Sequence, residues 1–244
     1  GGSAEMIRGT SSDVLPISRA VTGTRLGALC SRDHRVQLEW WARTASGEGR
    51  SPGASWMSRE QRQRIDALVD ADDRSTRLLA HAVASSMVNR VHSGMDPSNA
   101  VIDHAPDGRP MTRCGLEVSL SHSRTVVAVG VGKRGVRIGV DVEDIERADE
   151  AAHVAGMIAH PREEALLGTC PKARLKLWVA KEAAVKIGFT SLDEAHLLDL
   201  SALLEPGKAG CDRRIDWWRV IVGRMHVAVW NDQYCIGALA RVDR

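Results

Sequence analysis

Helical and strand-type segments alternate in two blocks along this sequence, and their order limits the folds that it can adopt. In the first block, apolar residues recur with helical spacing over residues 58–69 and 73–91. Three Val-rich or alternating strand-type runs follow at 116–123, 125–132 and 136–145. Helices followed by strands predict an α+β unit in this part of the chain.

The second block repeats that order. A short helical stretch leads into a longer helix over residues 172–187, and strand-type segments end the chain. Asn231 and Asp232 separate the last two of these strands and form a favourable hairpin turn. We therefore expect an α+β protein with two halves of similar design, residues 1–133 and 134–244.

Composition and charge exclude several classes of function. The chain has 244 residues, 43% of them hydrophobic, and a formal net charge of +2, so it can bury a core but has no basic excess for nucleic acid or a charged membrane. Its five cysteines are odd in number and include no CxxC pair, which argues against a disulfide framework or a zinc site. No apolar run is long enough to span a membrane. We expect a soluble, cytoplasmic, monomeric protein.

The longer helix of the second block carries charges on an apolar background. Its sequence LWVAKEAAVKIG, residues 177–188, is rich in Ala and Val but contains Lys181, Glu182 and Lys186. The chain has only six lysines, and four of them fall in this region. Residues four apart on a helix share a face, so Glu182 and Lys186 point to one place. The pair is either an ordinary exposed ion pair or part of a site that needs a carboxylate and an ammonium.

A second candidate lies in the strand-type run 136–145. Within GVDVE, residues 139–143, Asp141 and Glu143 are two apart, so both carboxylates lie on the same face of the strand. Neighbouring carboxylates repel each other unless a cation or a proton lies between them. Hard oxygen ligands suit Mg²⁺, which keeps several water or phosphate ligands. The alternative is a strand whose polar face is simply wet.

A third candidate combines hydroxyls, an imidazole and a guanidinium. SLSHS, residues 119–123, holds Ser121 and His122 at a strand end, and the preceding turn DGRP holds Arg109. These side chains, together with free backbone N–H groups, can bind a phosphate. No GxSxG elbow frames any of these serines, so a serine hydrolase is disfavoured.

Taken together and in this order, the motifs resemble those of the 4′-phosphopantetheinyl transferases of the larger, surfactin-synthetase-activating type. That family has a GRP or GKP turn, a strand ending in SHS, then G(I/V)D(I/V)E and WxxKEAxxKxxG; all four occur here in this order, the last of them matching through Lys186. The similarity extends from about residue 55 to the C-terminal strands. One departure follows Lys186, where the family usually continues xxGxGL and this chain has IGFTSL.

The resemblance implies a pseudo-twofold fold of two α+β halves with coenzyme A in the cleft between them. It implies that three carboxylates hold Mg²⁺, those of Asp141, Glu143 and Glu182. Lys186 matches the lysine beside the pyrophosphate of coenzyme A, and Lys181 either reaches a nucleotide phosphate or covers the rim of the helix. Four residues match positions at or near the 3′-phosphate of the nucleotide: Arg77, Arg109, Ser121 and His122.

The implied reaction transfers 4′-phosphopantetheine from coenzyme A to a serine of an apo acyl or peptidyl carrier protein and releases 3′,5′-ADP. Glu182 is the candidate base, either directly or through water, while Lys186 and Mg²⁺ neutralise the developing charge. This is the activity of a holo-acyl-carrier-protein synthase, which serves polyketide, nonribosomal peptide or fatty acid synthesis. The alternatives are a Mg²⁺-dependent phosphoesterase acting on coenzyme A-like pyrophosphates and a non-catalytic carrier-binding protein.

Residues 151–167, AAHVAGMIAHPREEALL, lie between the two acidic motifs and carry apolar side chains among polar ones. The resemblance implies a carrier that presents an acidic helix, so its docking surface would be apolar with a basic rim. We predict that surface here, with Met157 as an adaptable contact. The alternative is that Met157 and Ile158 are ordinary core residues.

Overall fold

The chain folds as two units, unit 1 (Gly1–Val136) and unit 2 (Arg137–Arg244), in the computed structural model. The sequence places this junction after residue 133. The structure describes residues 14–18, 21–46, 57–92, 100–205, 210–212 and 215–243. None of the helices in the described part of the chain combines the length and the hydrophobicity that a membrane crossing requires. Both units mix helices with a sheet, as the α+β prediction requires.

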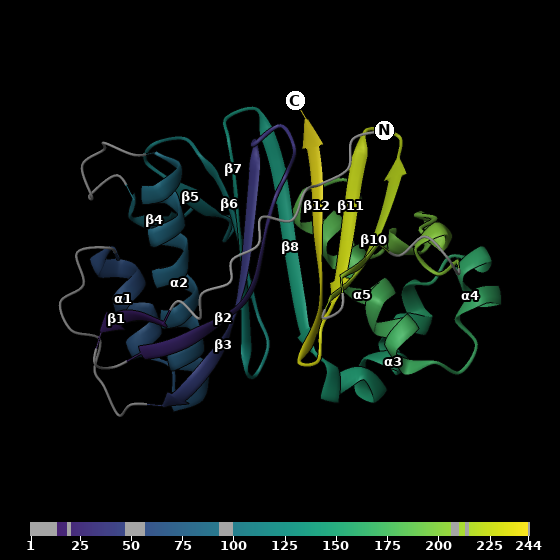
Figure 1. Ribbon diagram of the computed structural model, residues 1–244, viewed down its shortest axis with the longest axis horizontal. Helices are drawn as coiled ribbons and strands as arrows, with labels where there is room; N and C mark the ends of the chain where they lie inside the picture. Colours follow the sequence, from purple (N-terminus) through teal and green to yellow (C-terminus); the bar gives the residue numbers. More distant parts are fainter. Residues whose placement is uncertain are drawn as a thin grey trace. The chain divides into compact units, whose positions relative to one another are not determined.

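Unit 1 is built on a seven-stranded antiparallel sheet (Figure 1). Its spatial order is β1 (Val14–Ser18), β2 (Val21–Cys30), β3 (Val36–Ser46), β7 (Val126–Gly132), β6 (Glu117–His122), β5 (Pro110–Thr112) and β4 (Ile102–His104). The sequence predicts β6 and β7, but only a strand near residues 36–41 in the first 55 residues. It misses β2 because Gly23 and Gly27 interrupt the apolar pattern of that strand.

The described part of unit 1 contains two α-helices, α1 (Arg59–Asp66) and α2 (Ala71–Val91). The Asp70 carboxylate starts α2 by accepting hydrogen bonds from the backbone N–H groups of Asp72 and Asp73 at 2.7 and 3.0 Å. α2 packs on β7 and β6, and α1 packs on α2. The core of this unit combines residues of α2 with residues of the sheet, among them Trp41, Leu79, Val83, Met87, Ile102 and Val129.

Unit 2 contains a five-stranded sheet in the order β8 (Val136–Asp144), β12 (Cys235–Asp243), β11 (Met225–Asn231), β10 (Ile215–Val222) and β9 (Gly210–Asp212). Helix α5 (Pro171–Lys186) packs on β12 and β11, and α3 (Ala148–Ile158) packs on α5 (Figure 1). A short helix, α4 (Pro161–Leu167), lies between α3 and α5 in sequence. Short 3-10 helices span residues 145–147, 195–197 and 201–203. The sequence predicts α4, α5, β8 and the final hairpin, but not α3.

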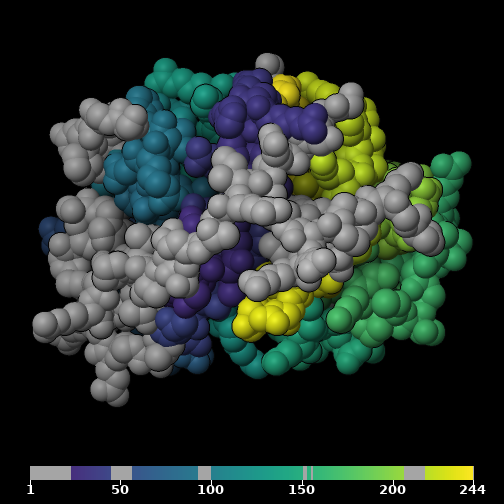
Figure 2. Space-filling model, in the orientation of Figure 1, coloured from purple at the N-terminus to yellow at the C-terminus, as the bar shows by residue number. Residues whose placement is uncertain are grey.

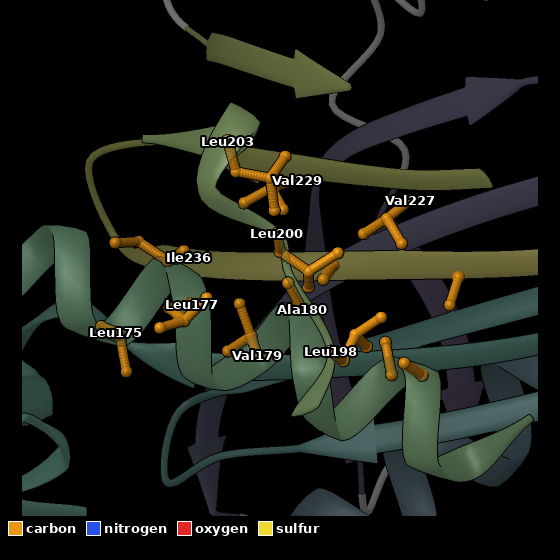
Figure 3. Close-up of a cluster of buried hydrophobic side chains, with 14 of the residues drawn as sticks. Leu175, Leu177, Val179, Ala180, Leu198, Leu200, Leu203, Val227, Val229 and Ile236 are labelled. Carbon is orange, nitrogen blue, oxygen red and sulfur yellow. The ribbon is translucent and has the colours of Figure 1, made fainter. Parts of the chain in front are cut away.

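The core of unit 2 lies between α5 and the sheet. Figure 3 shows apolar side chains of α5 facing those of the strands and of the segment that follows the helix. The labelled set is Leu175, Leu177, Val179, Ala180, Leu198, Leu200, Leu203, Val227, Val229 and Ile236. This contact buries one face of α5 and leaves its charged residues to be placed elsewhere.

Each unit has a hairpin in which a tryptophan lies over a glycine. Trp40 of β3 is paired with Gly27 of β2, and Trp230 of β11 is paired with Gly237 of β12. A Cβ atom on either glycine would come within 2.1 Å of the ring. Both tryptophans are fully buried. The two hairpins therefore require glycine for the same reason.

Candidate active site

The GVDVE strand and the WVAKEAAVKIG helix lie against each other in unit 2. Gly139 of β8 makes this approach possible, because a Cβ atom there would lie 2.2 Å from the carbonyl oxygen of Ala183 in α5. No flexible side chain could yield to relieve that contact, since the obstacle is backbone. The glycine of the motif thus sets the distance between strand and helix, and with it the distance between their charged side chains.

Asp141 and Lys186 form an ion pair across this contact. Nζ of Lys186 lies 2.8 Å from Oδ1 of Asp141 and donates a second hydrogen bond to the carbonyl oxygen of Val140, also at 2.8 Å. Asp141 is buried, whereas 32% of the Lys186 side chain is exposed. Two motifs that lie far apart in the sequence therefore place an ammonium beside a carboxylate, with one side open to a ligand.

Glu143 and Glu182 extend the acidic group around Asp141. Burial raises the pKa of Glu143 to about 7; Arg147 opposes this shift, and the negative charges of Asp141 and Asp144 add to it. Burial also raises the pKa of Glu182, and the charge of Asp141 raises it further. The negative charges of these carboxylates therefore repel one another, and a cation among them would be stabilised.

The chemistry of this donor set fits Mg²⁺, which prefers carboxylate oxygens. In the structure, the same oxygens face protein cations: Asp141 faces Lys186, and Oε2 of Glu143 lies 3.1 Å from Arg147. Within the described ranges, no set of three or more His, Cys, Asp or Glu side chains has the arrangement of a metal site. A magnesium site at Asp141, Glu143 and Glu182 stays a prediction, and it requires these protein cations to move aside.

The structure assigns Lys181 to the interior instead of to coenzyme A. The Lys181 side chain is fully buried, and Nζ lies 2.7 Å from Oε2 of Glu163. It donates its other hydrogen bonds to the carbonyl oxygens of Ile158 and Ala195 at 2.6 and 2.8 Å. An ammonium has three donors, and all three are used. The predicted contact between Lys181 and a nucleotide phosphate is corrected on this ground, because no donor is left for a ligand.

In unit 1, the predicted nucleotide-binding residues lie on three elements. Arg109 precedes β5 and pairs with Asp107 at 2.7 Å, with both side chains half exposed. Ser121 and His122 end β6, where Ser121 is buried and His122 is half-buried. Arg77 of α2 pairs with Asp73 at 3.0 Å.

Two histidines that the sequence did not single out lie close to this set. His81 of α2 is buried, and its ring centroid lies 5.4 Å from that of His104 in β4. Burial lowers the pKa of His81 to about 3, with further contributions from positive charge on His104, Arg77 and His122. Arg77 and His122 therefore share one electrostatic neighbourhood. Nothing in the local sequence pattern distinguishes His81 from a polar residue on the outer face of a helix.

A pocket of about 420 Å³ lies beside this neighbourhood, between α1 and the β4–β5 hairpin. Arg64 and His104 contribute cationic or titratable groups to it, and Gln61 joins it to His81 through a contact of 3.0 Å between their side-chain nitrogens. The full lining is Ser58, Glu60, Gln61, Arg64, Asp103, His104 and Met111. Met111 follows the Gly-Arg-Pro turn directly, so the pocket is adjacent in sequence to a motif that the resemblance assigns to the nucleotide.

Unit 2 therefore has an acidic group beside a lysine on an α+β framework, an arrangement suited to polar group transfer near a phosphate. The comparison with protein families is specific: residues 137–219 match the model of the 4′-phosphopantetheinyl transferase superfamily. The matched span contains Asp141, Glu143, Glu182 and Lys186. No curated protein matches the chain. The match supports a transferase of this superfamily, whose members act on coenzyme A and carrier proteins.

Proposed function

We propose that this protein transfers 4′-phosphopantetheine from coenzyme A to a serine of an apo acyl or peptidyl carrier protein, as in the surfactin-synthetase-activating type. One observation carries the proposal: Asp141, Glu182 and Lys186 share one electrostatic site inside the span that matches the superfamily. The modified carriers would serve polyketide, nonribosomal peptide or fatty acid synthesis.

Glu182 is the proton acceptor in this proposal. A serine hydroxyl is a poor nucleophile until its proton is removed, and the Glu182 carboxylate of the acidic group would accept that proton. The serine oxygen attacks the β-phosphorus of coenzyme A, a new O–P bond forms, and the bond from this phosphorus to the bridging oxygen breaks. The proton passes to Glu182 directly or through water, and the electron pair leaves with 3′,5′-ADP.

Lys186 balances the negative charge that develops as the bond to the leaving group breaks. Its ammonium lies at the partly exposed edge of the acidic group, where a pyrophosphate could replace Asp141 as its partner. Mg²⁺, when bound by Asp141, Glu143 and Glu182, supplies additional electrostatic stabilisation of the phosphate oxygens. Binding of both cationic groups at one edge would orient the substrate for attack.

Unit 1 supplies the nucleotide-binding residues in this proposal. Arg109, His122 and Ser121 would contact the 3′-phosphate, with Arg77 and the newly identified Arg64 contributing positive charge nearby. The cationic neighbourhood of His81 supports this division of roles.

The carrier would dock on a surface formed by α3 and α4, which we call the α3–α4 surface and define by Val154, Met157, Arg162 and Leu166. Met157 is 80% exposed, and Val154 and Leu166 are 41% and 49% exposed, so these apolar side chains are not core residues. Ile158, by contrast, is buried. Atoms of this part of unit 2, drawn in green, lie at the surface in Figure 2. Arg162, also exposed, is the basic side chain of this surface, and it pairs with Asp199 at 3.3 Å.

A substitution at Met157 tests the docking proposal. Met157→Asp should raise the KM for the carrier by about tenfold, about 1.4 kcal/mol, because it places a negative charge opposite an acidic partner. Coenzyme A affinity and Tm should not change. Val69→Asp is the matched control, since Val69 is fully exposed in unit 1. A normal carrier KM for Met157→Asp, or an equal rise in both variants, would place the docking surface elsewhere.

The transfer itself is tested by product analysis. The protein is incubated with coenzyme A, Mg²⁺ and a panel of apo carrier proteins, and each carrier is weighed by mass spectrometry. Transfer adds phosphopantetheine to the carrier serine and releases 3′,5′-ADP. Free phosphopantetheine without a modified carrier would indicate a phosphoesterase. A carrier that binds but stays unmodified would indicate a non-catalytic binding protein.

A further inference from the structure

Lys181 and Glu163 form an ion pair that is wholly enclosed in unit 2, with 0% of either side chain exposed. Besides Glu163, the Lys181 ammonium contacts the carbonyl oxygen of Ile158, the last residue of α3, and that of Ala195 in the 3-10 helix 195–197. One side chain of α5 therefore holds three other segments.

The carboxylate of Glu163 is satisfied with equal completeness. Oε2 accepts a hydrogen bond from the backbone N–H of His160 at 2.6 Å, and Oε1 accepts one from that of Leu200 at 2.7 Å. The contact with His160 is part of the capping box that starts α4. Glu163 therefore fixes the turn between α3 and α4 as well as the position of α5.

An ion pair in such a place is a poor source of stability. Removing two charges from water consumes most of what their attraction returns, and apolar residues of similar volume are often as stable. What the pair does supply is geometry, because each donor and acceptor has one partner in one direction. The contacts of Lys181 and Glu163 allow one placement of α5 against the α3–α4 turn.

The neighbours of the pair in sequence connect it to function. Lys181 precedes Glu182, and the side chains of successive helical residues point in directions about 100° apart. Because the Lys181 side chain points into the interior, the direction of the Glu182 side chain is set as well. Ile158, whose carbonyl oxygen contacts Lys181, follows the exposed Met157. The pair thus lies one residue from the candidate base and, through Ile158, one residue from the α3–α4 surface.

We propose that the Lys181–Glu163 pair is a positioning pair, which holds the α3–α4 surface in fixed register with Glu182. The proposal rests on the proposed function, since it explains how a carrier docked on α3 and α4 would present its serine to the base. Neither residue contacts a substrate. Loss of the pair would leave coenzyme A binding in place and weaken the productive placement of the carrier.

The test is the double variant Lys181→Met/Glu163→Gln, which removes both charges, keeps the length of the Glu163 side chain and shortens the Lys181 side chain by one heavy atom. We expect kcat/KM for the carrier to fall at least tenfold, with kcat lowered and the carrier KM raised. The Kd for coenzyme A should stay within twofold of the wild type. Val229→Ala is the matched control, because Val229 is fully buried in the core of the same unit and has no polar side-chain atom that could bond to the pair.

The comparison is made at a temperature where both variants are folded, judged by circular dichroism. If the double variant does not fold, Glu163→Asp alone is measured by the same criteria, because it keeps both charges and withdraws the carboxylate by one methylene from its partners. Carrier kinetics within twofold of Val229→Ala, in a folded variant, would overturn the proposal. Equal losses for coenzyme A and carrier would overturn it as well.

Hydrogen exchange separates this proposal from the proposed function. Amide exchange at Met157 and at Glu182 should accelerate together in the double variant, by at least tenfold relative to Val229→Ala. If exchange at only one of the two sites changes, the pair does not hold them in register and the proposal fails. If the wild type modifies no carrier, the proposed function fails, and the exchange result still decides whether the pair positions α3 against α5.

Discussion

In unit 1 the polar groups near the predicted site are mainly arginines and histidines, whereas in unit 2 they are largely carboxylates. Arg77, His104 and His122 lie around His81 in the first, and Asp141, Glu143 and Glu182 form the acidic group of the second. Both units present these groups on an antiparallel sheet packed by a long helix. One type of framework therefore carries opposite charges, set by a few positions on strand ends and helix faces.

The buried charges differ as well. In unit 1, Glu39 pairs with Arg90 at 2.5 Å, and 44% of the Arg90 side chain is exposed, so water reaches this pair. In unit 2, Lys181 and Glu163 are both enclosed. An exposed side chain such as that of Arg90 can change its conformation, whereas the enclosed side chains of Lys181 and Glu163 cannot. The stricter geometry is found in the unit that carries the candidate base.

The largest expected effect comes from neutralising the acidic group. Glu182→Gln and Asp141→Asn should each lower the transfer rate at least about 100-fold, about 2.7 kcal/mol in activation free energy, by removing the base or an anionic ligand. The Tm of Glu182→Gln should not fall, because the substitution removes repulsion between carboxylates, whereas Asp141→Asn also loses the ion pair with Lys186 and should lower the Tm. Asp193→Asn is the control, since Asp193 is exposed on unit 2 outside this group.

This prediction is measured by initial rates with saturating carrier, beside thermal unfolding of each variant. A Glu182→Gln variant that retains more than about a tenth of the wild-type rate, less than 1.4 kcal/mol, would show that Glu182 is not the base. The carboxylates that distinguish unit 2 from unit 1 would then have no demonstrated role as a base.

A smaller effect is expected in unit 1. Arg109→Ala and His122→Ala should weaken coenzyme A by about 10 to 100-fold, because a charge-assisted contact to phosphate is worth about 1.5 to 3 kcal/mol. Dephospho-coenzyme A, which lacks the 3′-phosphate, should lose much less affinity. Arg241→Ala in unit 2 serves as the control for loss of a surface arginine.

Isothermal titration of both ligands against each variant decides the matter. If a variant loses equal affinity for coenzyme A and for dephospho-coenzyme A, the substituted residue does not bind the 3′-phosphate. The cationic neighbourhood would then have a structural role alone.

The smallest expected effect is on the pH dependence of the free energy of unfolding, and it has opposite signs in the two units. The pKa of His81 is lowered from 6.5 to about 3 in the folded protein, so below pH 6.5 the unfolded chain takes up a proton that the folded one does not. Stability should fall by about 2 kcal/mol at pH 5 from this residue. The pKa of Glu143 is raised from 4.5 to about 7, so its contribution weakens the fold as pH rises through that interval.

Urea unfolding at pH 5 and pH 7.5, with a metal chelator present, compares the wild type with two variants. His81→Gln should reduce the loss of stability at pH 5, and Glu143→Gln should raise stability at pH 7.5 relative to the wild type. Unchanged pH profiles in both variants would contradict the assignment of opposite signs to the two units.

The family resemblance assigned the GVDVE strand and the KEAxxK helix to one site, but it did not predict the contacts within that site. The structure pairs Asp141 with Lys186 at 2.8 Å, an ion pair that the sequence did not predict. Lys181 could not be assigned in the same way. Helical periodicity states that it points away from Glu182, but not that Glu163 of another helix covers that direction.

Helices and strands were predictable where apolar residues recur with a single helical or strand spacing over a long segment. α2, α5, β7 and β8 have long apolar patterns, and they were found close to their observed bounds. α3 was missed because small residues dominate its sequence ADEAAHVAGMI and give a weak apolar face. The contact of His81 with His104 depends on two elements far apart in sequence, which no local pattern reports.

The tryptophan over a glycine in each unit has a spectroscopic consequence. Trp40 and Trp230 are both excluded from water, so each contributes blue-shifted emission while its own hairpin is intact. The chain has seven tryptophans, so these two signals are isolated only in a variant whose other five tryptophans are replaced by phenylalanine. Such a variant carries one internal fluorophore for each half, through which the order of unfolding of the two units can be recorded without a label.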